Sequence, residues 1–359
     1  MPSSVHIAGP ERGYAAHPGP LSVHPEVAEA IASGRAVVAL ESTILAHGLP
    51  PGDNLRVGRE IEAAVRAAGA VPATIALLDG QVRVGLDDAA LQRLCDPAAD
   101  ILKLSIRDVG VALALGRNGA TTVASTSALA HRAGISVFAT GGLGGVHRGA
   151  AQTFDISADL GVLARTPVLV VCAGVKSILD VAGTLEYLET LSVPVLGFRT
   201  DAFPGFYLSD SGYAAPWRVE SAAEAAAVVH ARDVLGGEAA GVLVEVGEQG
   251  RGDGLAVDAL AVEHGQPVVD QTVMQRRVDL PVDRQRVGEH HSGGLTAEHL
   301  AAMLDREGIH GKAVTPALLA YFHEHSGGES LRANVELVLA NAGLAGAVAV
   351  ELAARRGAA

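Results

Sequence analysis

Short apolar runs alternate with amphipathic segments along most of the chain. The runs predict buried strands at residues 36–40, 73–78, 101–104, 135–140, 168–173, 194–199 and 241–246. The segments between them predict helices at residues 54–68, 87–94, 109–115, 176–188 and 221–234. Strands and helices that alternate at this spacing indicate βα units, and therefore an α/β fold with a largely parallel or mixed sheet covered on both faces.

Three regions depart from this alternation. Residues 1–24 are rich in Pro, Gly and His, and we expect a flexible leader before a single domain at residues 25–355. Residues 247–294 lack a helical or strand period, so they form an atypical segment that we expect to be irregular and to lie off the sheet. The C-terminal third is mainly helical in pattern, at residues 296–307, 315–325 and 331–355.

Composition excludes several classes of protein. Hydrophobic residues make up 49% and charged residues 19% of the chain, which is typical of a globular protein. The net charge of −13 argues against a nucleic-acid surface, since that requires a basic patch. Cys95 and Cys172 are too far apart to suggest a zinc or disulfide framework. No secretory signal or membrane span is evident in the sequence, so we expect a cytoplasmic protein.

The chain has 24 arginines but three lysines: Lys103, Lys176 and Lys312. A lysine amine can lose its proton and attack a carbonyl carbon, whereas an arginine guanidinium stays protonated. Lysines that remain in an arginine-biased chain are therefore candidates for amine chemistry, although they could also be ordinary surface residues. Lys176 is the strongest candidate because it follows an apolar strand, where α/β folds place their sites.

Carboxylates near the ends of predicted elements are further candidates. Glu41 ends the first strand, where desolvation would raise its pKa toward the range of a general acid, unless it serves a helix cap formed with Ser42 or Thr43. Asp155 and Asp159 are four residues apart and would share one helix face, as ligands of a hard cation. The alternative is that Asp155 caps a helix and Asp159 is a solvated acid in its first turn.

A glycine-rich run at residues 141–149 follows a predicted strand. It does not fit a dinucleotide fingerprint, because His147 occupies the third glycine position, and the chain contains no Walker sequence. Two interpretations remain. The run is either a tight crossover loop or a cradle of backbone amides for an anion, assisted by His147 and Arg148.

The sequence resembles the pseudouridine-5′-phosphate glycosidase family, also called the indigoidine synthase A-like family. The resemblance covers roughly residues 25–235 and 308–350. It is carried by residues 37–44 (VVALESTI), 47–50 (HGLP), 69–75 (GAVPATI), 118–126 (NGATTVAST), 138–149 (FATGGLGGVHRG), 153–160 (TFDISADL), 172–180 (CAGVKSILD), 311–316 (GKAVTP) and 330–335 (SLRANV). One departure is that family members usually continue after residues 242–246 with an Asn-Pro loop and a helix, whereas residues 247–294 show neither.

The resemblance implies an α/β/α sandwich, a homotrimer, a Mn²⁺-assisted site and a phosphorylated nucleoside as substrate. By position, Glu41 matches the family's proton donor, Lys176 its nucleophile and Asp155 its metal ligand. The implied substrate contacts are Lys103, Val123, Ser157, Ala158 and Asp159, with His147 and Asn334 as further pocket residues.

The implied reaction is the reversible cleavage of a carbon–carbon glycosidic bond, which gives uracil and ribose 5-phosphate through a lysine imine. Two alternatives remain open from the sequence. One is a different Schiff-base lyase that acts on a phosphosugar, and the other is a binding protein of the same family without catalytic activity.

Overall fold

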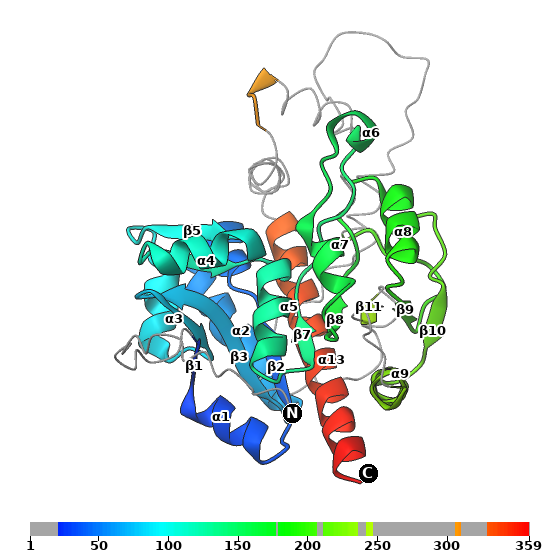
Figure 1. Ribbon diagram of the computed structural model, residues 1–359, viewed down its shortest axis with the longest axis horizontal. Helices are drawn as coiled ribbons and strands as arrows, with labels where there is room; N and C mark the ends of the chain where they lie inside the picture. The colour runs from blue at the N-terminus through cyan, green and yellow to red at the C-terminus, as the bar shows by residue number, and fades with distance from the viewer. Residues whose placement is uncertain are drawn as a thin grey trace, which may run out of the picture.

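A mixed sheet runs through the centre of the molecule, with helices on both of its faces (Figure 1). The computed structural model describes residues 21–176, 179–206, 211–235, 242–246, 306–309 and 329–358. In this part of the chain the strand order is β1-β4-β3-β2-β7-β8-β11-β9-β10, and β6 pairs with β3 and β5. The strands are β1 (Leu21–Val23), β2 (Val37–Leu40), β3 (Val71–Leu78), β4 (Gln81–Val84), β5 (Ile101–Leu104), β6 (Asn118–Thr121), β7 (Val137–Ala139), β8 (Leu169–Cys172), β9 (Val195–Phe198), β10 (Trp217–Val219) and β11 (Val242–Val246).

Most neighbouring strands in this sheet are parallel, and the antiparallel pairs are β3 with β4 and β3 with β6. Parallel strands need crossover connections, which here are mostly helices. The helices are α1 (Pro25–Ala32), the π-helical turn η1 (Ile44–Gly48), α2 (Asp53–Ala67), α3 (Asp88–Cys95), α4 (Ile106–Ala114), α5 (Val123–Arg132), α6 (Ala150–Thr153), α7 (Ala158–Leu163), α8 (Val181–Thr190), α9 (Ala222–Val234) and α13 (Glu329–Gly357).

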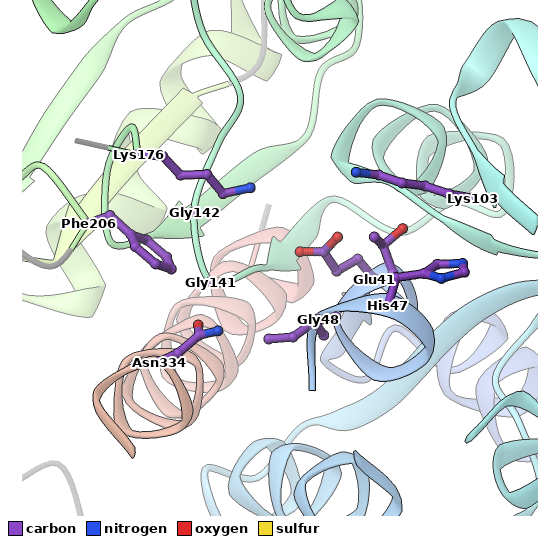
Figure 2. Close-up of a pocket in the computed structure, with 11 residues that line it drawn as sticks. Glu41, His47, Gly48, Lys103, Gly141, Gly142, Lys176, Phe206 and Asn334 are labelled. Carbon is purple, nitrogen blue, oxygen red and sulfur yellow. The ribbon is translucent and has the colours of Figure 1, made fainter. Parts of the chain in front are cut away.

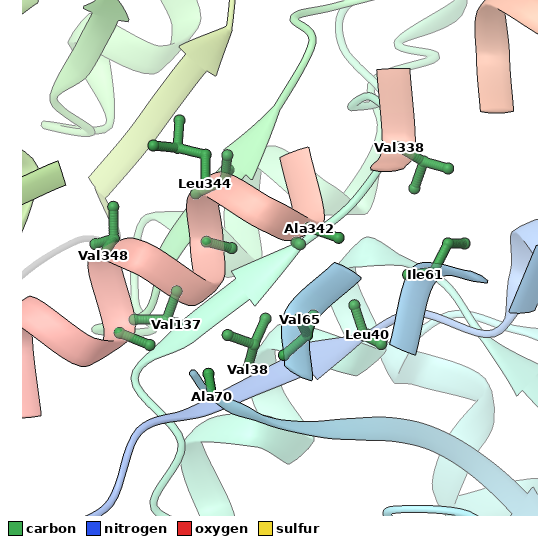
Figure 3. Close-up of a cluster of buried hydrophobic side chains, with 14 of the residues drawn as sticks. Val38, Leu40, Ile61, Val65, Ala70, Val137, Val338, Ala342, Leu344 and Val348 are labelled. Atoms are coloured by element: carbon green, nitrogen blue, oxygen red, sulfur yellow. The ribbon is translucent and has the colours of Figure 1, made fainter. Parts of the chain in front are cut away.

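Alternate residues of the central strand β2 enter separate hydrophobic cores, one on each face of the sheet. Val38 and Leu40 pack in a cluster with buried residues of α2, α9 and α13, part of which Figure 3 shows. Val37 and Ala39 pack in a second cluster with buried residues of α1, α5, α7 and α8. Because side chains of a strand alternate between faces, a strand buried on both sides reads as a continuous apolar run. The predicted α/β/α sandwich is confirmed.

Helix α13 is the central helix of the first of these clusters. It packs against α2, α9 and strands β2, β7 and β8. Gly346 allows its close approach to α2, since a Cβ atom there would lie 2.6 Å from the Cβ of Ala68. By length and composition, residues 331–357 could cross a membrane, whereas the sequence predicted no membrane span. The packing of α13 against the sheet accounts for its apolar character.

Several predicted boundaries are wrong. Leu21–Val23, expected in the leader, form β1 and pair with β4. The helix predicted from residue 176 begins at Val181, so Lys176 lies in a loop. The strand β6 and the helix α5 were not predicted. The helix predicted at residues 331–355 is confirmed. The rest of the leader, the segment 247–294, Lys312 and nearly all of the other two C-terminal helices lie outside the described residues.

Candidate active site

The ends of several parallel strands surround one cavity. Glu41 follows β2, Gly141 lies just after β7, and Lys176 lies beyond the end of β8. Carboxyl ends of parallel strands lie at the same edge of a sheet, so residues far apart in the sequence meet there. The cavity has two adjoining lobes, of about 60 Å³ and about 340 Å³. Both lobes are lined by Glu41, Thr43, Lys103, Gly142 and Lys176.

Glu41 is held in a setting that favours its protonated form. The hydroxyl of Thr140, at the end of β7, donates a hydrogen bond to its Oε1 atom. Burial raises the pKa of the Glu41 carboxyl, and the negative charge of Asp159 raises it further. The Thr140 hydrogen bond and the charges of Lys176 and Lys103 oppose this rise but do not cancel it. The net shift favours the protonated carboxyl, as a proton donor requires. The interpretation as a simple helix cap is not supported, because no side chain caps the helical turn η1 that follows.

Lys176 shows the opposite shift. Burial lowers the pKa of its amine, while the negative charges of Glu41 and Asp159 act in the other direction without reversing it. Figure 2 shows the Lys176 amine and the Glu41 carboxyl facing a common space, which the Lys103 amine approaches from the other side. Both shifts are in the direction that acid catalysis and nucleophilic attack require, toward a protonated carboxyl and a free amine.

Asp159 joins two parts of the site through backbone hydrogen bonds. Its Oδ1 accepts from the N–H of Ala124 at 2.9 Å, and its Oδ2 accepts from the N–H of Gly144 at 3.0 Å. Asp159 is buried, with 8% of its surface exposed. Asp159 thus connects the first turn of α5 to the glycine-rich loop, and also supplies a fixed negative charge near Glu41 and Lys176.

Asp155 and Asp159 do not share a helix face, which corrects one sequence interpretation. Asp155 precedes α7, and Ser157 is the residue that caps this helix, by accepting a hydrogen bond from the N–H of Asp159. The alternative, a cap at Asp155 with a solvated Asp159, is also wrong, because Asp159 is buried. Asp155 remains on the wall of the larger lobe with Ser157 and Ala158.

The donor set for a metal ion is small. The Oδ2 atom of Asp155 lies 3.7 Å from Nδ1 of His147, and both residues line the larger lobe. No group of three or more His, Cys, Asp or Glu side chains that could hold a metal ion occurs among the described residues. A hard cation can bind through one carboxylate when water and substrate oxygens complete its coordination. Asp155 fits that kind of site, although a cage made of protein ligands is not present in the described part of the chain.

The glycine-rich loop serves packing more than anion binding. The N–H of Leu143 donates to the carbonyl oxygen of Gly174, and the N–H of Gly144 donates to Oδ2 of Asp159. The N–H of Val146 donates to Oγ1 of Thr184, and the N–H of His147 donates to the carbonyl oxygen of Asp155. A Cβ atom at Gly145 would lie 2.4 Å from Oγ1 of Thr184, so this position requires glycine. Because these four amides are already occupied, they are not available to an anion, which favours the interpretation as a tight crossover loop. Arg148 is exposed and does not line either lobe.

The N-terminal end of α5 and nearby cations are better placed for an anion. Thr122 and Val123 bring the start of α5 to the larger lobe, together with Lys103 and Arg107. The first N–H groups of a helix carry partial positive charge and favour anions, although the N–H of Ala124 in α5 already donates to Asp159. Three carboxylates, those of Asp108, Asp155 and Asp159, line the same lobe. The structure thus places the predicted contacts Lys103 and Val123 in one lobe, where they can act on the same group.

Other residues of the site were missed from the sequence or were identified through the resemblance alone. Asn334 of α13, which the resemblance implied, lines the smaller lobe with His47 and Phe206. The Oδ1 atom of Asn334 and the Nε2 atom of His47 are buried without a hydrogen-bond partner in the structure. Thr140 and Phe206 were not predicted. Thr140 could have been noticed because it lies between a strand and the glycine run.

Comparison with known proteins identifies the family of the chain. The sequence profile of the indigoidine synthase A like protein family matches residues 26–260 and 278–351. The chain belongs to this family. The matched ranges include parts of the segment 247–294 and omit residues 261–277.

Two relatives of the chain carry the name pseudouridine-5′-phosphate glycosidase. The protein from Salinispora tropica is 53% identical over 331 residues, which cover 92% of this chain and 91% of the relative. The protein from Streptomyces griseus is 50% identical over 332 residues, covering 92% of each chain. Family membership therefore rests on nearly the full length of the chain.

Two solved structures share the fold. One is the prealnumycin C-glycosynthase AlnA in complex with ribulose 5-phosphate, with a TM-score of 0.75 and 36% identity, covering 94% of this chain and 99% of that one. The other is an indigoidine synthase A-like protein from Thermotoga maritima, with a TM-score of 0.70 and 29% identity, covering 95% and 99% of the two chains. The α/β fold deduced from the strand pattern is thus also that of two experimentally determined structures.

The buried amine leads to a prediction about stability. Lys176→Met keeps an unbranched side chain but removes a group whose folded-state pKa lies below its ordinary value of 10.5. Such a group destabilises the fold most below its folded pKa, and the effect disappears as the pH rises to the unfolded value. We expect Lys176→Met to raise the melting temperature at pH 7, with a smaller gain near pH 10.

The control for this experiment is Arg107→Met, which removes a cation whose side chain is 77% exposed. It should leave the melting temperature nearly unchanged at both pH values, because an exposed charge keeps its hydration. Thermal unfolding followed by circular dichroism would check both variants. A lower melting temperature for Lys176→Met at pH 7 would show that the amine stabilises the fold.

Proposed function

We propose that this chain is a pseudouridine-5′-phosphate glycosidase, which cleaves the carbon–carbon bond between uracil and ribose 5-phosphate and can form it in reverse. The observation that carries the proposal is the pair of opposite pKa shifts, upward for Glu41 and downward for Lys176, at one cavity. The names and identities of the relatives from Salinispora tropica and Streptomyces griseus support the same activity.

Substrate binding would use both lobes of the cavity. The phosphate group fits the larger lobe, where Lys103, Arg107 and the start of α5 provide positive charge. The sugar would then lie between Glu41 and Lys176, which line both lobes. Asn334 has an unsatisfied buried carbonyl oxygen in the wall of the smaller lobe, and this oxygen can accept a hydrogen bond from a substrate N–H or O–H.

The reaction begins with proton transfer from Glu41 to the ring oxygen of the ribose, and the bond from this oxygen to C1′ breaks. The free amine of Lys176 then adds to C1′. The added nitrogen gives up a proton, and C5 of uracil takes up a proton in its place. The nitrogen lone pair then forms a C1′=N bond as the bond from C1′ to C5 breaks. Water adds to the imine carbon and releases ribose 5-phosphate together with the free amine.

Asp155 is the residue that would hold Mn²⁺, with His147 beside it. When bound, the cation would supply a positive charge that orients water and substrate oxygens in the larger lobe. The preference of manganese for carboxylate, carbonyl and water oxygens suits the single carboxylate of Asp155.

The remaining expectations concern the cellular setting. We infer a homotrimer in the cytoplasm from the family resemblance, and the activity would belong to nucleotide catabolism. Light scattering coupled to gel filtration would measure the mass in solution, which should be three times the 36.5 kDa of one chain.

An alternative is a C-glycosynthase or another Schiff-base lyase that acts on a phosphosugar. The similarity to the prealnumycin C-glycosynthase, at 36% identity, is the observation in its favour. The relatives named as glycosidases are more similar, at 53% and 50% identity, so the glycosidase is the preferred function. Release of uracil from pseudouridine 5′-phosphate distinguishes the two, and turnover would also exclude a protein that only binds its ligand.

The nucleophile can be identified by trapping. Incubation of the purified protein with pseudouridine 5′-phosphate, Mn²⁺ and borohydride should reduce the imine and leave ribose phosphate attached to the peptide that contains Lys176. Lys176→Arg keeps a cation but cannot form the imine, and should be inactive and untrapped. Lys103→Arg is the matched control, and we expect it to weaken binding and still give the adduct. An adduct on Lys103 or Lys312, seen by mass spectrometry, would contradict the assignment.

The acid can be tested with Glu41→Gln, which preserves the shape of the side chain and removes its proton. We expect kcat to fall by about 10²–10⁴-fold, the range typical of a positioned acid, while binding measured by calorimetry changes little. Glu62→Gln is a suitable control, because Glu62, like Glu41, is a partly buried carboxyl with a raised pKa. It accepts a hydrogen bond from Thr74, away from the cavity. If binding is lost and the turnover of the bound fraction stays normal, Glu41 positions the substrate instead.

The metal site can be tested with Asp155→Ala. We expect a loss of activity that excess Mn²⁺ restores only in part, because the variant retains water and substrate ligands but no carboxylate. Direct binding of Mn²⁺, followed by electron paramagnetic resonance, should weaken in the same variant. Full activity of the wild-type protein after exhaustive chelation would exclude a metal role.

A further inference from the structure

A buried amide contacts the backbone of the residue that hydrogen-bonds to Glu41. Asn341, on α13, is completely buried. Its Nδ2 atom donates to the carbonyl oxygen of Thr140 at 2.8 Å and approaches that of Gly141 at 3.4 Å. The hydroxyl of the same Thr140 donates a hydrogen bond to Oε1 of Glu41. A chain of hydrogen bonds therefore runs from the central helix of the core to the carboxyl that faces the cavity.

The position of Asn341 is unusual for an amide. Its neighbours on α13, Ala342, Leu344 and Ala345, belong to the hydrophobic cluster between this helix and the sheet. The Oδ1 atom of Asn341 is buried without a hydrogen-bond partner, which carries a penalty of about 1–3 kcal/mol for a neutral group. Rotating the amide would place its oxygen against two carbonyl oxygens, so the donor orientation is the favourable one. An apolar residue would remove this penalty but would leave the carbonyl oxygen of Thr140 without the donor that Asn341 provides. The amide therefore ties α13 to the backbone next to Glu41.

The Thr140–Gly141 segment is held from two sides. On one side lies strand β8. The N–H of Thr140 donates to the carbonyl oxygen of Val171, and the N–H of Ala173, just after β8, donates to the carbonyl oxygen of Gly141, each at 3.0 Å. Asn341 binds the carbonyl groups of both residues from α13. The backbone of Thr140 is thus fixed by groups from β8 and α13, and its side chain is directed at Glu41.

We propose that Asn341 is a positioning residue, which acts through Thr140 to hold the Glu41 carboxyl in its proton-donating arrangement. The inference extends the proposed glycosidase reaction, since Glu41 is the acid of that reaction. The groups whose charges act on Glu41 are Lys176, Lys103 and Asp159. Asn341 is uncharged and does not line the cavity, so its influence passes through the Thr140 backbone and hydroxyl.

The test measures the ionisation of Glu41 directly, by ¹³C NMR of protein labelled at its glutamate carboxyls. The signal that disappears in Glu41→Gln identifies the residue. Loss of the Thr140 hydrogen bond destabilises the ionised carboxylate, so the pKa of Glu41 should rise in Thr140→Val. We expect Asn341→Leu to raise it in the same direction, and the double variant to match Thr140→Val alone, since the two residues act in series.

Kinetics give a second readout. A small displacement of a catalytic group can cost about 10²-fold in rate, so we expect Asn341→Leu to lower kcat about 10–100-fold, with a smaller change in KM. Val348→Ala, a completely buried position on the same helix, is the control for a general loss of packing. It should lower the melting temperature and leave the pKa of Glu41 and kcat near their wild-type values. Asn341→Ala provides the same test if the leucine variant does not fold.

The two readouts separate this inference from the proposed function. If the wild-type protein releases no uracil but the pKa of Glu41 still follows Asn341 and Thr140, the glycosidase assignment fails and the positioning role stands. If uracil is released and neither Asn341 variant alters the pKa of Glu41 or kcat more than Val348→Ala does, Asn341 is a packing residue. Additive effects in the double variant would also overturn the proposal, because they would show that Asn341 does not act through Thr140.

Discussion

The site depends on the burial of an amine and a carboxyl at one cavity. In water, Lys176 would be protonated and Glu41 ionised at neutral pH, which is the reverse of what nucleophilic attack and acid catalysis require. Burial destabilises the charged form of each group, so it lowers the pKa of the amine and raises that of the carboxyl. Attraction between the two charged forms acts against both shifts. The architecture around the cavity must therefore exclude water without placing strong counter-charges on either group.

The surrounding backbone meets this requirement by satisfying its own hydrogen bonds. Backbone N–H groups of the loop after β7 donate to Gly174, Asp159 and Thr184, and its glycines permit close contacts with neighbouring residues. Asp159 is the main buried negative charge nearby, and backbone N–H groups hold both of its oxygens. Its charge raises the pKa of both Glu41 and Lys176, so it favours the protonated acid while limiting the shift of the amine.

The sequence predicted the framework better than the details of the site. Strands buried on both faces, such as β2 and β8, are continuous apolar runs and were found readily. The β6–α5 region was missed because Asn118–Thr121 and most of α5 are built from small side chains that give no apolar period. Glu41 and Lys176 were recognised because they follow strands and because lysine is rare. Thr140 and Asp159 act through partners 99, 35 and 15 positions away, which no local pattern encodes.

The glycine run shows why a motif needs its partners before it can be interpreted. Glycines after a strand are typical both of anion-binding loops and of tight crossovers, and the sequence alone left both open. Four amides of this loop are bonded within the protein, which favours a packing role for the run. Lys103, Arg107 and the start of α5 lie together on the wall of the larger lobe, which Asp108, Asp155 and Asp159 also line. An anionic group bound there leaves the proton donor and the amine free for the reacting carbon, which a phosphate held by the glycine loop would not.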